Sequence, residues 1–185
     1  MGDVKEKAPS QPEIRKLTTA KGIKKGANPN EMAVINLSRR GIKTIESLEL
    51  PNLRRLDLSG NHLTRLKGLQ GCPQVSYLQV ANNELTGEGL EGVRNFPDLK
   101  VFNASGNKLK LLTPAVFGKF RNLQALVLAN NEISEVPPSW FNKRLQASLN
   151  TLVLSHNKVD SLTGAKLGRL GALTKLSLSH NMLRE

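Results

Sequence analysis

The chain has 185 residues, enough for one domain with a sizeable core. Hydrophobic residues make up 38% of it but aromatic residues only 4%, which excludes a core built on aromatic packing and indicates one of aliphatic side chains. Lys and Arg number 27 against 15 Asp and Glu, and the resulting net charge of +12 favours anionic partners such as RNA or acidic protein segments.

The cysteine count and the hydropathy pattern indicate a cellular compartment. Cys72 is the only cysteine, so an internal disulfide is excluded, and we expect this side chain to fill a position in the core. No apolar run approaches the length of a membrane span, about 18 to 20 residues, and the first residues lack the apolar region of a secretory signal. We therefore expect an intracellular protein, either cytoplasmic or nuclear, including the nucleolus.

Residues 1–31 are predicted to form a basic, partly flexible N-terminal tail. Seven basic and three acidic side chains fall within residues 1–30. Ser10 precedes Glu13 by three residues, which is the spacing of a capping box, and Ile14 and Leu17 follow. A short helix is therefore expected here as a cap on the domain that follows.

From residue 32 onward the sequence repeats the pattern L-x-x-L-x-L-x-x-N-x-L, whose positions we number 1 to 11. Copies begin at residues 32, 53, 75, 99, 123, 149 and 173, with spacings of 21, 22, 24, 24, 26 and 24 residues. Apolar residues at positions 4 and 6 are expected to be buried on one face of a short strand, with their neighbours exposed. A domain of about seven repeats is predicted over residues 32–185, the last repeat being incomplete.

Position 9 is expected to hold a buried asparagine that satisfies backbone groups where the chain turns out of each strand. The column consists of Asn61, Asn83, Asn107, Asn131, Asn157 and Asn181. Arg40 takes this place in the first copy, which marks that copy as terminal. Between the strands, apolar residues recur about every three positions, which predicts short helical turns on the opposite side. Trp140 and the phenylalanines of these segments are expected in the core.

This pattern and its spacing resemble those of the leucine-rich-repeat family. The resemblance covers roughly residues 32–185 and implies an α/β solenoid, a horseshoe with a parallel β-sheet on its concave face and short helical or irregular segments on its convex face. The copy LRRLDLSGNHLTRLKGLQGCPQ is similar to intracellular repeats of phosphatase-regulatory and spliceosomal proteins, whereas the 24-residue copies are closer to the general type. The resemblance implies a non-catalytic binding module and transfers framework residues only.

No pattern predicts catalysis or a cofactor. The sequence contains no glycine-rich phosphate loop, no paired carboxylates at a matching spacing and no plausible base beside Cys72. His156 and His180 share position 8 of the last two repeats, so we expect them about one strand spacing, ~4.8 Å, apart. A metal site requires three or four ligands, and adjacent columns supply no third one. We predict neither a metal, a cofactor nor an enzymatic activity.

The exposed strand positions are the expected binding surface, because repeat proteins present an extended curved face there. The candidate partner-binding residues are Arg39, Arg54, Arg55, Tyr77, Lys100, Val101, Val127 and Val153. The arginines form a basic zone that can hold phosphate or carboxylate, with Tyr77 adding stacking beside Arg55, although a solvated basic surface is the alternative. The valines form a mildly apolar zone that can receive a partner helix or peptide, although β-propensity also explains them.

Three functions are compatible with this surface. The first is a protein-interaction scaffold that holds a partner on the concave face within a larger intracellular assembly. The second is a ribonucleoprotein component, nuclear or nucleolar, whose basic N-terminal zone contacts RNA. The third is a phosphatase regulatory subunit, which rests on the family resemblance alone.

The last repeat is predicted to lack a cover. After Leu183 the convex half of the repeat is missing, so we expect Leu176, Leu178 and Leu183 to face solvent. We therefore expect the chain to be part of a longer protein, with a subunit contact at this end as the alternative.

Overall fold

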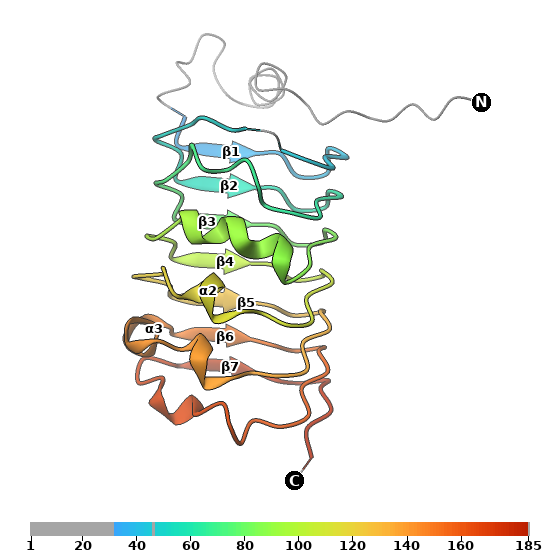
Figure 1. Cartoon of the computed structure of the whole chain (residues 1–185), viewed down its shortest axis with the longest axis vertical. Coiled ribbons are helices and arrows are strands. Elements are labelled where there is room, and N and C mark those ends of the chain that lie inside the picture. Colours follow the sequence, from blue (N-terminus) through green and yellow to red (C-terminus); the bar gives the residue numbers. More distant parts are fainter. Residues whose placement is uncertain (1–31, 46, 185) are drawn as a thin grey trace, which may run out of the picture.

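The computed structural model describes residues 32–45 and 47–184, which form one solenoid with a single parallel sheet (Figure 1). The predicted tail and its capping box at Ser10 lie outside these residues. Seven strands follow one another in chain order across the sheet. They are β1 (Val34–Asn36), β2 (Arg55–Asp57), β3 (Tyr77–Gln79), β4 (Val101–Asn103), β5 (Ala125–Val127), β6 (Thr151–Val153) and β7 (Lys175–Ser177).

Each strand covers positions 3 to 5 of its repeat, and equivalent positions lie opposite each other in neighbouring strands. Ile35 pairs with Leu56, which pairs with Leu78. From β1 to β6 the central residue is buried and the outer two are exposed or half-buried. The predicted leucine-rich-repeat solenoid is therefore confirmed, and positions 3 and 5 form the open face of the sheet.

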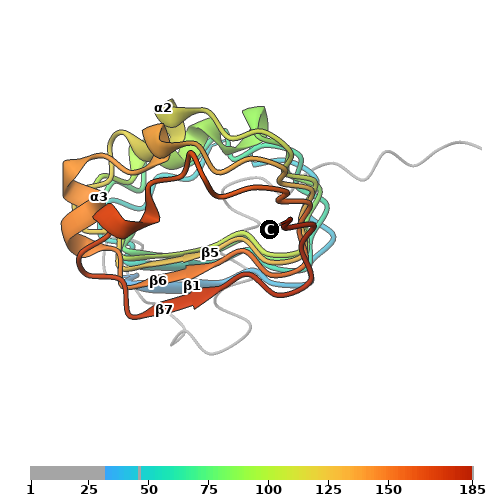
Figure 2. The same cartoon turned by 90° about the horizontal axis from the view of Figure 1, so that it is seen from below.

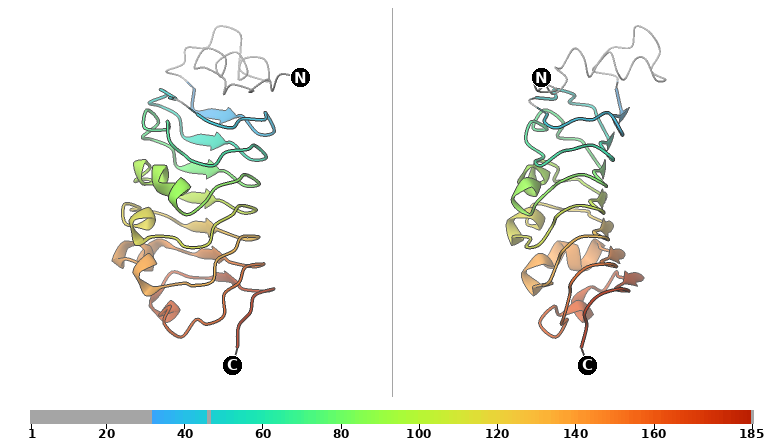
Figure 3. Two further views of the ribbon diagram at one scale, coloured as in Figure 1. Left: turned by 45° about the vertical axis from the view of Figure 1, so that its right-hand side comes forward. Right: turned by 90° about the vertical axis from the view of Figure 1, so that its right-hand side faces the viewer.

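The return segments lie across the solenoid from the sheet, as the view along its axis shows (Figure 2). Their short helices are η2 (Glu88–Asn95), α2 (Pro114–Phe117), η3 (Pro138–Trp140), α3 (Lys143–Ser148) and η4 (Leu167–Arg169). Helical turns are thus confirmed for the longer repeats. In the described part of the 21- and 22-residue repeats the chain returns through turns instead, because fewer residues are available to cross the convex side. Figure 3 shows the sheet and these segments on opposite sides along the stack.

The core between these layers is aliphatic, with one aromatic cluster. Trp140 is buried, and its indole N–H donates to the carbonyl of Leu112 at 2.9 Å. Its ring lies 5.1 Å from that of Phe117, and Phe120 and Phe141 complete the cluster. The prediction that these aromatic residues belong to the core is confirmed. They fill the wider convex side of the longer repeats.

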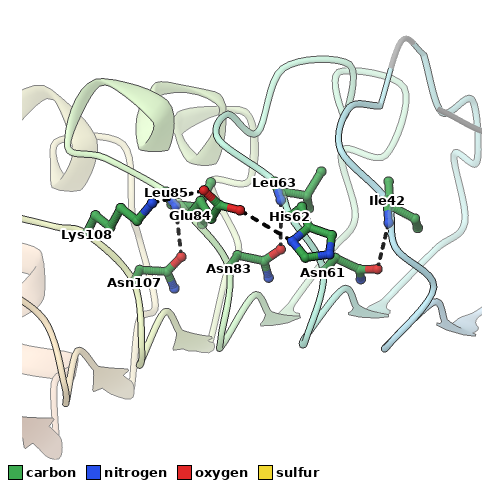
Figure 4. Close-up of polar contacts among 9 residues, drawn as sticks. All are labelled: Ile42, Asn61, His62, Leu63, Asn83, Glu84, Leu85, Asn107 and Lys108. Atoms are coloured by element: carbon green, nitrogen blue, oxygen red, sulfur yellow. Dashed lines mark hydrogen bonds and ion pairs between the residues drawn. The ribbon is translucent and has the colours of Figure 1, made fainter. Parts of the chain in front are cut away.

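The asparagine column joins every described repeat to the one before it (Figure 4). The side-chain amide of Asn107 donates to the carbonyls of Val80, at 3.1 Å, and Ala104, at 3.0 Å. Its oxygen accepts the backbone N–H of Leu85 at 3.0 Å. The other five asparagines make the equivalent three bonds. The predicted role of position 9 is confirmed.

Position 8 has a backbone requirement that the pattern alone does not reveal. All seven residues there have a left-handed conformation, with φ between 53° and 68°. They are Arg39, Gly60, Asn82, Gly106, Asn130, His156 and His180. Glycine and asparagine adopt this conformation most readily, which explains why they fill four of these positions.

Removal of a central asparagine should destabilise the solenoid strongly. Asn107→Ala leaves the buried N–H of Leu85 without a partner and removes one of the two asparagine amides that donate to each of the carbonyls of Val80 and Ala104. We expect the free energy of unfolding to fall by about 2 to 4 kcal/mol. Asn181→Ala, at a half-buried site where water can replace the amide, should cost about 1 kcal/mol. Urea denaturation measures both, and equal losses would contradict the assigned role.

Alanine at position 8 should also destabilise the fold. Gly106 has a φ of 64°, and a Cβ atom there would lie 2.3 Å from the side-chain oxygen of Asn82. We expect Gly106→Ala to lower the free energy of unfolding by about 1 to 3 kcal/mol. Gly168→Ala is the matched control, since a Cβ atom there has nothing within 4 Å. Thermal unfolding of both variants tests the difference, and a neutral Gly106→Ala would refute it.

Candidate partner-binding face

The basic part of the open sheet face is organised around Arg55 and Tyr77. The two residues stand at position 3 of their repeats, in β2 and β3, and lie opposite each other in the register of the sheet. The guanidinium carbon of Arg55 lies 4.1 Å from the centroid of the Tyr77 ring. This cation–π contact holds the guanidinium above the sheet.

A shallow depression of about 230 Å³ surrounds this pair. It is lined by Val34, Ile35, Asn36, Arg55, Leu56, Asp57, Tyr77 and Gln79, all from β1 to β3. Val34 contributes an exposed apolar surface, with 58% of the residue accessible to solvent. We call these eight residues the β1–β3 depression.

Polar groups of this region have free hydrogen-bonding capacity. Within residues 32–45 and 47–184, no acidic side chain forms an ion pair with Arg54 or Arg55. Asp57 accepts the backbone N–H of Ser59 at 2.9 Å, and Asn36 accepts that of Ser38 at the same distance. The arginine donors are therefore available to a partner, whereas part of the carboxylate of Asp57 is engaged.

Arg39 and Lys100, two of the predicted partner-binding residues, lie outside the depression. Arg39 follows β1 at position 8, where its side chain passes over Gly60, because a Cβ atom added to that glycine would lie 2.9 Å from the Cγ atom of Arg39. Arg39 follows the C-terminal end of its strand, whereas Arg54 precedes the N-terminal end of the next strand. Lys100 is exposed and directly precedes β4, at the same repeat position as Arg54 but two strands away.

The apolar zone lies farther along the sheet. Val101 lies opposite Tyr77 on one side and Ala125 on the other, so it connects the two zones. Val127 and Val153 are opposite each other in β5 and β6, and both are half-buried. The strand residues of β5 and β6 carry no charge. The sheet face thus changes along its length from donor-rich and basic to small and apolar.

One polar feature was missed by the sequence reasoning. Position 10 forms a ladder of alternating charges along the flank, in which Glu84 lies 2.9 Å from Lys108 and 3.3 Å from His62 (Figure 4). Glu132 lies 2.9 Å from Lys158, also at position 10, and 3.7 Å from Lys110, at position 12. The signal was the alternation His, Glu, Lys, Glu, Lys at one repeat position. Such exposed pairs stabilise the fold little.

The charge ladder shifts the ionisation of its carboxylates. The hydrogen bond from Lys108 is the main cause that lowers the pKa of Glu84, with the charge of Lys108 and a bond to His62 adding to it. The pKa of Glu132 is lowered chiefly by the hydrogen bond from Lys158 and then by the charges of Lys110 and Lys158. Both side chains are therefore ionised at neutral pH.

Cys72 and the pair His156 and His180 are the side chains that the sequence singles out for possible chemistry. Cys72 is buried as predicted, and its thiol donates to the carbonyl of Leu48 at 3.1 Å. Burial raises the pKa of this thiol to about 11. The rings of His156 and His180 are stacked with centroids 4.0 Å apart and an angle of 10° between their planes. Among the described residues no group of three or more potential metal ligands is found.

The exposed surface of the last repeat agrees in part with the expectation. Leu176 is 42% and Leu183 43% accessible, whereas Leu178 is partly buried and packs against the core.

Over the part of the chain that the structure describes, no helix is both long and apolar enough to span a bilayer.

Family models place the repeats independently of the structure. The model described as "Leucine rich repeat" matches residues 73–133 and 121–183, and that of "Leucine Rich repeats (2 copies)" matches residues 51–90. Together they cover most of the chain. The narrower intracellular repeat types are not distinguished by these matches.

Curated relatives share this repeat region. Lumican of Homo sapiens is 32% identical over 140 residues, which are 74% of this chain and 38% of lumican. Toll-like receptor 9 of Mus musculus is 31% identical over 138 residues, which are 72% of this chain and 13% of the receptor. The chain therefore spans well under half the length of either protein.

Solved structures agree on the fold. Internalin C2 of Listeria monocytogenes superposes with a TM-score of 0.76 at 24% identity, over 96% of this chain and 76% of the internalin. A second internalin of that organism gives a TM-score of 0.75 at 20% identity, over 93% of this chain and 49% of its own. At these identities the likeness establishes the solenoid fold alone.

The burial of Cys72 should make its thiol unreactive in the folded protein. With a pKa of about 11, the thiolate that attacks disulfide reagents is scarce at pH 8. We expect the reagent DTNB to react at least about a hundredfold more slowly with the folded protein than with the protein unfolded in urea, since each pKa unit is a factor of ten. Completion within seconds on the folded protein would contradict this placement.

Proposed function

Since the chain belongs to the leucine-rich-repeat family, whose members are in general binding scaffolds without catalytic activity, we propose that it holds a protein partner on its concave face within a larger intracellular assembly. The open face of the sheet from β1 to β6 is the proposed interface. It is a continuous strip of exposed and half-buried side chains that the framework leaves free.

The observation that carries this proposal is the composition of that strip. The arginine donors at Arg54 and Arg55 have no acidic partner among the described residues, and Val127 and Val153 offer apolar contact farther along. The sheet face offers free hydrogen-bond donors at one end and apolar groups at the other, above a buried polar framework. Such a face suits a protein segment that spans several repeats.

Direct RNA contact is the second candidate. The net charge of +12 favours it, as do Arg54 and Arg55, which form no ion pair within the described part of the chain, and it would imply a nuclear or nucleolar ribonucleoprotein. A phosphatase regulatory role is the third candidate, and it rests only on the form of the 22-residue repeat that begins at residue 53.

Substitutions in the two zones distinguish these candidates. The tagged protein is used to capture partners from its native cells, with and without nuclease, and at two salt concentrations. We expect Val127→Asp to release a protein partner in a nuclease-independent manner, because a charge is placed in the apolar zone. The matched control is Lys119→Glu in the return segment after α2, which should retain the partner.

Two outcomes would contradict the scaffold proposal. The first is that the partners disappear with nuclease, and that the double variant Arg54→Glu with Arg55→Glu abolishes RNA binding that was steeply salt-dependent. In that case the protein binds RNA and the scaffold proposal is wrong. If Lys119→Glu releases the partner while the sheet variants retain it, the interface lies on the other side of the solenoid.

A further inference from the structure

We propose that the β1–β3 depression binds an extended peptide segment in which an acidic residue lies beside an apolar one. The carboxylate would lie on Arg55, and the apolar side chain would pack against Val34. This inference rests on the proposed scaffold function and specifies the chemistry of the partner at one end of the interface.

The carboxylate position follows from the preorganised guanidinium. Arg55 is held over the ring of Tyr77 at 4.1 Å, and no side-chain hydrogen bond or ion pair of Arg55 is found within residues 32–45 and 47–184. Contact with the ring limits the rotamers of the arginine, so less entropy is lost when it binds an anion. Carboxylates match the fork of guanidinium donors through paired hydrogen bonds.

The apolar position follows from the floor and edge of the depression. Val34 is 58% accessible as the first residue of the edge strand β1, and the buried Ile35 and Leu56 form the floor beside it. A volume of about 230 Å³ accommodates one or two side chains rather than a whole domain. Val34 and Arg55 lie opposite each other in the register of β1 and β2, so the two features are adjacent.

The polar column at position 5 suits the backbone of such a peptide. Asn36, Asp57 and Gln79 lie in register on β1 to β3. The oxygen of Asn36 is engaged by Ser38, so its amide N–H groups remain as donors, and Gln79 offers both a donor and an acceptor. The carboxylate of Asp57 can accept from a peptide N–H. Peptide groups supply both donors and acceptors and therefore match this mixed column.

The same features disfavour RNA at this place. Tyr77 is the only aromatic residue at positions 3 and 5 of the described strands, and the guanidinium of Arg55 already covers one face of its ring. Base stacking on aromatic side chains is a main source of single-strand affinity. Asp57 lies two residues from Arg55 on the same face and would repel a backbone with a phosphate at every unit. A single carboxylate on Arg55 meets this repulsion once and not at every unit.

The test is a selection with the whole chain as the bait. A phage library of random 12-residue peptides is selected on the immobilised protein, and a synthetic peptide from the enriched set is then titrated by fluorescence polarisation. We expect enriched peptides to share an Asp or Glu next to an aliphatic or aromatic residue. Arg55→Glu should weaken binding at least about tenfold and Tyr77→Ala severalfold, with weaker binding at raised salt. Lys119→Glu, which changes charge on the return side, should change it less than about twofold.

The other outcomes separate this inference from the function on which it rests. Neutral peptides that ignore Arg55→Glu but are lost with Val127→Asp would overturn the inference and leave the concave scaffold intact. Peptides that ignore every sheet variant would overturn both. If no peptide is enriched but single-stranded RNA of mixed sequence binds in a manner that depends on Arg55, the ligand of the β1–β3 depression is RNA and not a peptide. Circular dichroism and thermal unfolding of Arg55→Glu confirm that an exposed substitution has left the fold unchanged.

Discussion

The hydrogen bonds of the asparagine column are the interaction on which the rest of this structure depends. Where the chain leaves each strand, one backbone N–H would otherwise be buried without a partner, and each carbonyl accepts from the asparagines of two neighbouring repeats. One amide side chain such as Asn107 bonds one N–H and two carbonyls, and two of these three groups belong to the preceding repeat. Each repeat is thereby completed only by its neighbour. The stack is cooperative for this reason, and its repeats cannot shift in register without leaving several backbone groups unsatisfied.

The repeat positions that stabilise the solenoid differ from those that can recognise a partner. Positions 4, 6, 9 and 11 are committed to the core or to the asparagine column, and position 8 must accept a left-handed backbone. Positions 3 and 5 are not constrained in this way. Their side chains form columns one strand apart, so a change at one place, such as Tyr77, leaves the frame unaltered. The transition from the β1–β3 depression to the apolar pair Val127 and Val153 is therefore a feature of the face alone, which is where a partner can be selected.

Much of this architecture was predictable because each repeat obeys the same local chemistry. The strands, the asparagine column and the core position of Trp140 follow from the repeat pattern, and the neighbourhood of Arg55 and Tyr77 follows from their shared position. The separation of Arg39 from Arg54 was not foreseen, since it depends on the left-handed turn that carries Arg39 over Gly60. The form of the return segments was only partly predictable, because helices there depend on how many residues remain to cross the convex side. The charge ladder at position 10 required pairing by repeat position rather than by distance along the chain.

Photo-cross-linking from defined positions tests most directly whether the open sheet face is the interface. A photoreactive amino acid replaces Tyr77 or Val153 on the sheet, or Lys119 or Arg144 on the return side, and the protein is irradiated in its native cells. The account predicts that the same protein partner is cross-linked from Tyr77 and Val153 and not from the return side. Cross-links obtained only from Lys119 or Arg144 would contradict it.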